Sequence, residues 1–133
     1  MPKLKTYIVE DSPVIRENLI ATLEELGPIE VVGTAEDEAS AVQWMSVNAH
    51  RFDLAIVDVF LKHGSGIGVL KALSALPRNH IAVVSSNYAT AEIRRKCLEL
   101  GAARVFDKSN EIDDLLAYCC RLAAGETGQG ELT

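Results

Sequence analysis

Acidic, hydroxyl and lysine side chains stand where four apolar runs of this chain end. Glu10 and Asp11 follow the first run, and Asp58 ends a later one. Ser86 and Lys108 follow two further runs. Parallel strands bring such ends to one edge of a sheet, where open α/β folds bind ligands. The sequence therefore predicts one site for phosphate chemistry.

Glu10 and Asp11 are neighbouring carboxylates, and they repel each other unless a cation neutralises them. With Asp58 they would make an all-oxygen site, which suits Mg²⁺ because this ion takes a few carboxylates and fills its other positions with water and phosphate oxygen. Adjacent acids are also common as solvated loop residues. The acid pair alone leaves both interpretations open.

Asp58 is the candidate nucleophile, because a carboxylate in line with an incoming phosphoryl group can form an acyl phosphate. Lys108 would bring positive charge to the phosphoryl oxygens, and the Ser86 hydroxyl could hydrogen-bond one of them. Taken singly, such a lysine is usually solvated and such a serine usually caps a helix. Their common place at strand ends favours the site.

Five strand-like runs alternate with five helix-like segments along the chain. The predicted strands cover 4–9, 30–35, 53–58, 81–85 and 104–106. Ser12 and Pro13 indicate a helix start, Gly64-Ser65-Gly66 a flexible turn, Gly101 a helix end and Ser109-Asn110 a cap for the last helix. This alternation predicts an α/β fold with a doubly wound parallel sheet.

Length and composition indicate one domain, since 133 residues with 48% hydrophobic content suffice for one core. We expect the domain to cover 1–124 and 125–133 to be a polar tail or a truncated linker. The net charge of −6 disfavours binding to nucleic acid or to anionic lipid. The first apolar segment is too short for a signal peptide or a membrane span, which indicates a cytoplasmic protein.

Cysteine and histidine residues give no sign of a metal or hydrolytic site. Cys97, Cys119 and Cys120 are odd in number and lack metal-ligand spacing, so we expect reduced thiols. The histidines lack a nucleophile-elbow motif and are expected at the surface: His50, His63 and His80.

The ordered set of motifs resembles the receiver domain of two-component response regulators, of which the single-domain chemotaxis regulator is the best-known example. The resemblance spans roughly 4–123. It is carried by Glu10-Asp11-Ser12, Asp58 with Gly66, Ser86, Gly101-Ala102 and Lys108. It implies a flavodoxin-like fold with five parallel strands in the order 2-1-3-4-5 and five helices.

The resemblance also implies roles for single residues. Asp58 would accept a phosphoryl group from a histidine kinase or a histidine phosphotransfer protein, so the chain would be a stoichiometric phosphoacceptor rather than an enzyme. Ser86 would be the switch hydroxyl and Lys108 the phosphate contact. The Mg²⁺ ligands would be Glu10, Asp11, Asp58 and the Phe60 backbone carbonyl.

Ser85 competes with Ser86 for the switch role. Ser86 lies fifteen residues before Gly101, the separation usual in this family, and it is therefore chosen. Ser85 would then point to the opposite face of the sheet.

Two residues depart from the family pattern. Lys62 stands where a proline is frequent, which would alter loop stiffness. Val105 stands where an aromatic switch residue is frequent, and Phe106 cannot replace it because adjacent strand residues face opposite ways. The departure at Val105 puts the usual aromatic coupling in doubt.

The sequence also gives expectations about the hydrolysis of the acyl phosphate and about the surface that binds a protein target. Phe60 and Tyr88 border the path of the hydrolytic water in this family, and both side chains are large here. If the sequence is complete, no output domain follows the fifth helix, and we then expect a protein target on the surface of helix four, strand five and helix five. On this surface Arg94, Arg95 and Lys96 could meet an acidic partner or form an ordinary solvated face.

Other functions were weighed against a phosphorylated receiver. A flavin binder shares the fold, but Glu10-Asp11 would repel its phosphate. A phosphatase with an aspartyl nucleophile needs a nearby second acid, which Val59 and Phe60 do not supply. The remaining alternative is a degenerate receiver that binds proteins without being phosphorylated.

Overall fold

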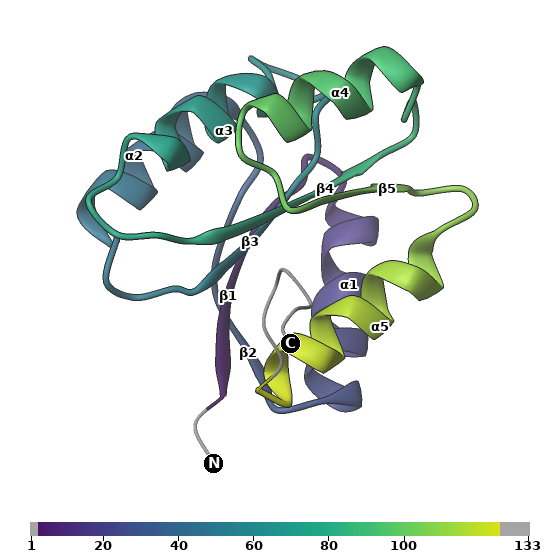
Figure 1. The fold of residues 1–133 in the computed structure, drawn as a ribbon. Helices are drawn as coiled ribbons and strands as arrows, with labels where there is room; N and C mark the ends of the chain where they lie inside the picture. The colour runs from purple at the N-terminus through teal and green to yellow at the C-terminus, as the bar shows by residue number, and fades with distance from the viewer. Residues whose placement is uncertain (1–2, 126–133) are drawn as a thin grey trace.

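The computed structural model describes residues 3–125, in which five strands alternate with five helices (Figure 1). The predicted tail at 125–133 lies, apart from Gly125, outside the described residues. The elements are β1 Leu4–Val9, α1 Pro13–Leu26, β2 Ile29–Ala35, α2 Glu38–Val47, β3 Leu54–Val57, α3 Gly66–Ser74, β4 Ile81–Ser86, α4 Ala91–Glu99, β5 Arg104–Asp107 and α5 Ile112–Ala123.

All five strands are parallel and lie in the order β2-β1-β3-β4-β5. This confirms the predicted topology. The register pairs Val9 with Val57 and Val57 with Val84, so β1 and β3 end at the same level, while β4 continues two residues farther, to Ser86. The strand order reverses between β1 and β3, and a crevice for ligands forms at such a switch point.

One face of the sheet is covered by α2, α3 and α4 (Figure 1). Its core contains the stacked rings of Tyr7 and Trp44, whose centroids are 4.1 Å apart, with Phe52 beside them. Gly33 packs directly under this stack, since a Cβ there would lie 2.8 Å from a Trp44 ring atom. A larger residue at position 33 would displace the ring.

The other face is covered by α1 and α5 (Figure 1). Leu23, Phe106 and Leu115 are buried there. Between the two helices a cavity of about 350 Å³ opens toward the ends of the strands, and Ser85 and Leu19 are among its lining residues.

The ends of several elements differ from the sequence prediction. Ser12 caps α1 as expected, but Ser109 and Asn110 do not cap α5. Glu111 holds the N-cap position and makes no side-chain cap hydrogen bond. The turn predicted at 64–66 leads into α3: Gly64 has a positive φ of 81°, Ser65 is the N-cap, and Gly66 is already the first residue of the helix. Strand β3 is shorter than predicted, since Asp53 and Asp58 flank it.

The histidine and cysteine predictions had mixed outcomes. His50 and His63 are exposed, but His80 is half-buried against Phe52, and its Nε2 lies 2.7 Å from the Ala49 carbonyl oxygen. The prediction of a surface histidine was therefore wrong at His80. All three thiols are free, and burial raises the pKa of Cys119 to about 12. Among the described residues no helix is long and apolar enough to cross a membrane.

Candidate functional site

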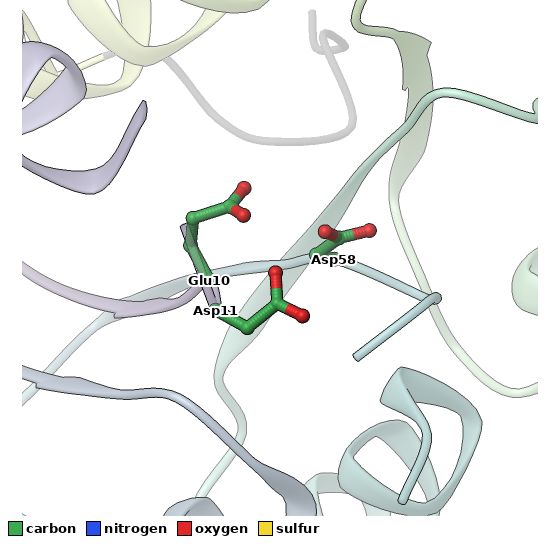
Figure 2. A group of neighbouring side chains, drawn as sticks. All are labelled: Glu10, Asp11 and Asp58. Carbon is green, nitrogen blue, oxygen red and sulfur yellow. The ribbon is translucent and has the colours of Figure 1, made fainter. Parts of the chain in front are cut away.

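Three carboxylates meet at the ends of β1 and β3, as Figure 2 shows. One oxygen atom from each of Glu10, Asp11 and Asp58 lies within 4.8 Å of the others. Glu10 and Asp58 are buried, with 4% and 6% exposure. The parallel register places these residues together, as the sequence predicted.

Lys108 reaches the same cluster from the turn after β5. Its Nζ lies 2.5 Å from Glu10 Oε1 and 2.9 Å from Asp58 Oδ2. All three side chains of these pairs are at most 11% exposed. A buried ammonium held by two carboxylates is fixed in place, because moving it would leave buried charges unpaired.

The pKa values of Glu10 and Lys108 reflect this burial. Burial raises the pKa of Glu10, although the Lys108 ammonium and the Ser12 amide oppose the shift. For Lys108, burial alone would lower the pKa, but hydrogen bonds to Glu10 and Asp58 outweigh it and raise the pKa. The lysine therefore stays charged at neutral pH.

The ionised cluster has a charge of −2, because three carboxylates face one ammonium (−3 + 1). Asp11 is half-buried, and its carboxylate accepts no hydrogen bond from any described residue. A group of carboxylate oxygens with excess negative charge fits a hard divalent cation such as Mg²⁺. Both oxygens of Glu10 and both oxygens of Asp58 already accept hydrogen bonds, so Asp11 is the most available ligand of the three.

The backbone around Asp58 is closely packed. The Phe60 amide donates to Asp58 Oδ1 at 3.2 Å, which orients the carboxylate. Gly66 begins α3 directly against the Asp58 peptide, since a Cβ at Gly66 would lie 2.2 Å from the Asp58 carbonyl oxygen. Any side chain at position 66 would push α3 away from the site.

Glu38 of α2 holds the loop between β3 and α3. Its Oε1 accepts a hydrogen bond from the Ser65 amide at 2.9 Å, and its own amide donates to the His63 carbonyl at 3.2 Å. The side chain of Lys62 is exposed in this loop. Glu38 thus restrains the loop that carries Lys62 where a proline is frequent.

Ser86 ends β4 and is fully buried. Its Oγ accepts a hydrogen bond from the Tyr88 amide at 3.1 Å, and its carbonyl accepts one from the Lys108 amide at 2.9 Å. Within the described residues it has no hydrogen bond to Asp58. Ser85 pairs with Phe106 in the register and lines the cavity between α1 and α5, which agrees with its expected place on the opposite face.

Phe60 and Tyr88 form an edge-to-face ring pair with centroids 5.4 Å apart. The pair joins the loop after β3 to the loop after β4. Both residues are largely exposed, at 49% and 65%.

Arg16 is a site residue that the sequence prediction missed. Its Nη1 donates to the Glu10 carbonyl at 2.8 Å, and its Nη2 pairs with Glu36 at 3.3 Å. It therefore ties α1 to the ends of β1 and β2. Its position one turn after the Ser12 cap, facing the acid pair, was the signal available.

The sequence profile of the response regulator receiver domain family matches residues 6–119. Over 107 residues the chain is 35% identical to a protein-glutamate methylesterase/protein-glutamine glutaminase of Syntrophus aciditrophicus. That match covers 79% of this chain but only 30% of the relative. The chain thus spans about a third of the length of that relative.

Solved structures give the same fold. The signal receiver domain of NarL from Mycobacterium tuberculosis superposes with a TM-score of 0.81 at 25% identity, covering 95% of this chain and all of that one. CheY in the CheX–CheY–BeF₃–Mg²⁺ complex from Borrelia burgdorferi superposes with a TM-score of 0.74 at 18% identity, covering 87% and 89% of the two chains.

Proposed function

The chain belongs to the response regulator receiver domain family, and on that premise we propose that Asp58 accepts a phosphoryl group in two-component signalling. The observation that carries the proposal is the pairing of Lys108 with Asp58 and Glu10 at the end of the sheet. This geometry fits phosphoryl transfer, in which catalysis consists mainly of positioning and charge stabilisation.

The reaction forms one bond and breaks one. An Asp58 carboxylate oxygen forms a bond to phosphorus while the bond from phosphorus to the imidazole nitrogen of a partner's phosphohistidine breaks, and that nitrogen takes the electron pair. With acetyl phosphate the broken bond is P–O and acetate leaves. Lys108, 2.9 Å from Asp58 Oδ2 before the reaction, offsets the charge of the transferred group.

Glu10, Asp11 and Asp58, with the Phe60 carbonyl, would hold Mg²⁺. The ion would supply positive charge to the carboxylates and to the phosphoryl oxygens. The charge of −2 on the cluster supports this assignment, because without a cation a dianionic phosphoryl group would be repelled.

Phosphorylation would act through Ser86 and the loops that flank the site. The Ser86 hydroxyl would leave the Tyr88 amide to bind a phosphoryl oxygen, which moves the loop after β4 and changes partner affinity. We place the partners in the cytoplasm: a histidine kinase or phosphotransfer protein as donor, and a protein target on α4, β5 and α5. We assign no role in binding nucleic acid or membrane.

The Phe60–Tyr88 ring pair would lengthen the lifetime of the acyl phosphate. Hydrolysis needs a water molecule aligned with phosphorus, and the two rings cover the approach from the loops after β3 and β4. Replacing both residues by serine should accelerate dephosphorylation. Unchanged dephosphorylation kinetics in this double variant would remove the idea.

Incubation with acetyl phosphate and Mg²⁺, followed by intact-mass measurement, tests the proposed function. We expect one phosphoryl addition to the wild type and none to Asp58→Asn or to a metal-free sample. If the wild type gains no mass under conditions that phosphorylate a known receiver, the degenerate protein-binding module replaces the proposal.

A further inference from the structure

Arg94 of α4 binds three different segments through the three sides of its guanidinium group. Its Nε donates to the Ala89 carbonyl at 3.0 Å, and its Nη1 donates to the Val105 carbonyl at 2.9 Å. Its Nη2 pairs with Glu111 Oε1 at 2.9 Å. One side chain thus joins the loop after β4, strand β5 and the start of α5.

Glu111 extends this contact to the turn that carries Lys108. The same Oε1 atom accepts a hydrogen bond from the Asp107 amide at 2.8 Å, and the Glu111 amide donates to the Asp107 carbonyl at 2.8 Å. These bonds close the turn from Asp107 to Glu111 around Lys108. They also explain why Glu111 does not cap α5, since its carboxylate is turned back toward β5.

Lys108 is therefore fixed both at its ammonium group and at its backbone amide. Its ammonium binds Glu10 and Asp58, while its backbone amide donates to the Ser86 carbonyl at 2.9 Å. Because the turn is fixed by Glu111 and Arg94, the path from Arg94 to Lys108 consists of two hydrogen bonds, from Arg94 to Glu111 and from Asp107 to Glu111, and of the peptide bond between Asp107 and Lys108. Contiguous hydrogen-bonded networks of this kind can carry coupling between sites.

The neighbouring basic residue behaves differently. Among the described residues Arg95 pairs only with Glu99, one turn along α4, and the two side chains are 65% and 56% exposed. Arg94 and Glu111 are 35% and 34% exposed. Exposed pairs of this type contribute little to stability, so Arg95 provides a matched control with the same charge on the same helix.

We propose that Arg94 and Glu111 are positioning residues that couple the surface of α4, β5 and α5 to Lys108. The inference rests on the proposed function and deepens it. The pair lines a groove of about 290 Å³ together with Leu98 and Phe106, where a partner can reach it. A partner carboxylate that bound Arg94 would draw it from Glu111 and loosen the turn of Lys108, and phosphorylation would reciprocally alter partner affinity.

The test compares Arg94→Gln with Arg95→Gln in the wild type and in a Lys108→Met background. The rate of phosphorylation by acetyl phosphate with Mg²⁺ is measured at subsaturating donor, after circular dichroism has shown that each variant is folded. We expect Arg94→Gln to be about fivefold slower than wild type and Arg95→Gln to be unchanged. In the Lys108→Met background Arg94→Gln should have no further effect. Equal slowing in both backgrounds, or slowing by Arg95→Gln as well, would overturn the proposal.

A second measurement does not depend on phosphorylation. The ¹H–¹⁵N chemical shifts of the Asp107 and Lys108 amides should change in Arg94→Gln and in Glu111→Gln but not in Arg95→Gln. Unchanged shifts in Arg94→Gln would contradict the inference. If the wild type fails to take up phosphate, the proposed function fails, while these shifts still decide whether the pair positions the turn.

Discussion

Charged side chains are paired differently at the two ends of the sheet. At the amino ends of β3 and β4, Arg78 donates to Asp53 at 3.0 Å and to the Ala49 carbonyl at 3.3 Å, so each charge has its own partner. At the carboxyl ends, three carboxylates share Lys108. The comparison shows that the charges are paired at one end and that negative charge is in excess at the other, as is expected where a protein departs from the pattern that favours stability.

Aromatic residues show the same difference. Phe52 is fully buried at the amino end and contacts the rings of Tyr7, Trp44 and His80. Phe60 at the carboxyl end is 49% exposed, and among the described residues its ring makes one aromatic contact, with the ring of Tyr88. We therefore expect packing at the amino end to contribute more to stability than the exposed aromatic pair at the carboxyl end does.

Truncation of Phe52 and of Phe60 gives the largest expected difference between the two ends of the sheet. Phe52→Ala should lower the free energy of unfolding by about 3–5 kcal/mol, because it leaves a cavity among three rings. Phe60→Ala should change it by less than about 0.5 kcal/mol. Urea unfolding measures both values, and similar losses in the two variants would show that both ends are structural.

Lys108→Met removes the ammonium that the site carboxylates share. We expect a loss of about 3 kcal/mol in metal-free buffer, since Glu10 and Asp58 are then buried without a counter-charge. Added Mg²⁺ should recover part of this loss, because a cation that binds the folded state stabilises it. Urea unfolding with and without Mg²⁺ measures both effects, and a loss that Mg²⁺ leaves unchanged would argue against a metal site at this cluster.

Replacing an aspartate by asparagine should change the free energy of unfolding in opposite directions at the two ends of the sheet. Asp58→Asn removes one of three crowded carboxylates and should raise the free energy of unfolding by about 1 kcal/mol without metal. Asp53→Asn removes the partner of Arg78 and should lower it by less than about 1 kcal/mol, because the pair is partly exposed. Thermal unfolding in metal-free buffer compares them, and two shifts of the same sign would contradict the assignment.

The pH dependence of the free energy of unfolding should show the smallest effect of these predictions. Hydrogen bonds from Arg94 and from the Asp107 amide lower the pKa of Glu111 below its ordinary value of 4.5. Its stabilisation is therefore fully present above pH 4.5 and is lost as the pH falls through the lower, folded-state pKa. Glu111→Gln should therefore be less stable than wild type at pH values above 4.5 and equally stable below the folded-state pKa of Glu111.

Burial shifts the pKa of Glu10 upward instead, so Glu10→Gln should raise the free energy of unfolding at neutral pH in metal-free buffer. Urea unfolding on both sides of pH 4.5 checks both signs.

Local sequence signals predicted the fold and most of the site. The alternation of apolar runs predicted a parallel sheet, and the resemblance to receiver domains supplied the strand order. The acids at strand ends predicted the carboxylate cluster, because parallel register places such residues together. The start of α1 was predicted because its Ser12 cap is a local interaction. Features that depend on a few neighbouring residues could therefore be predicted from the sequence.

Contacts between distant segments could not be predicted in this way. The basic run 94–96 was expected to bind an acidic partner or to be solvated, yet Arg94 is engaged with Glu111, seventeen residues away across β5. Glu111 in turn displaced the cap expected at Ser109 and Asn110. Such pairings depend on how α4 packs beside β5 and α5, and no local pattern records this geometry.

The aromatic stack of Tyr7 and Trp44 has an optical consequence. Trp44 is the sequence's one tryptophan, and its ring contacts are to Tyr7 and Phe52 rather than to the carboxylate cluster. Its fluorescence emission should shift to longer wavelength when the chain unfolds and water reaches the indole. Metal binding at the other end should leave that emission nearly unchanged. The protein thus contains a spectroscopic reporter of folding that is separate from its chemistry.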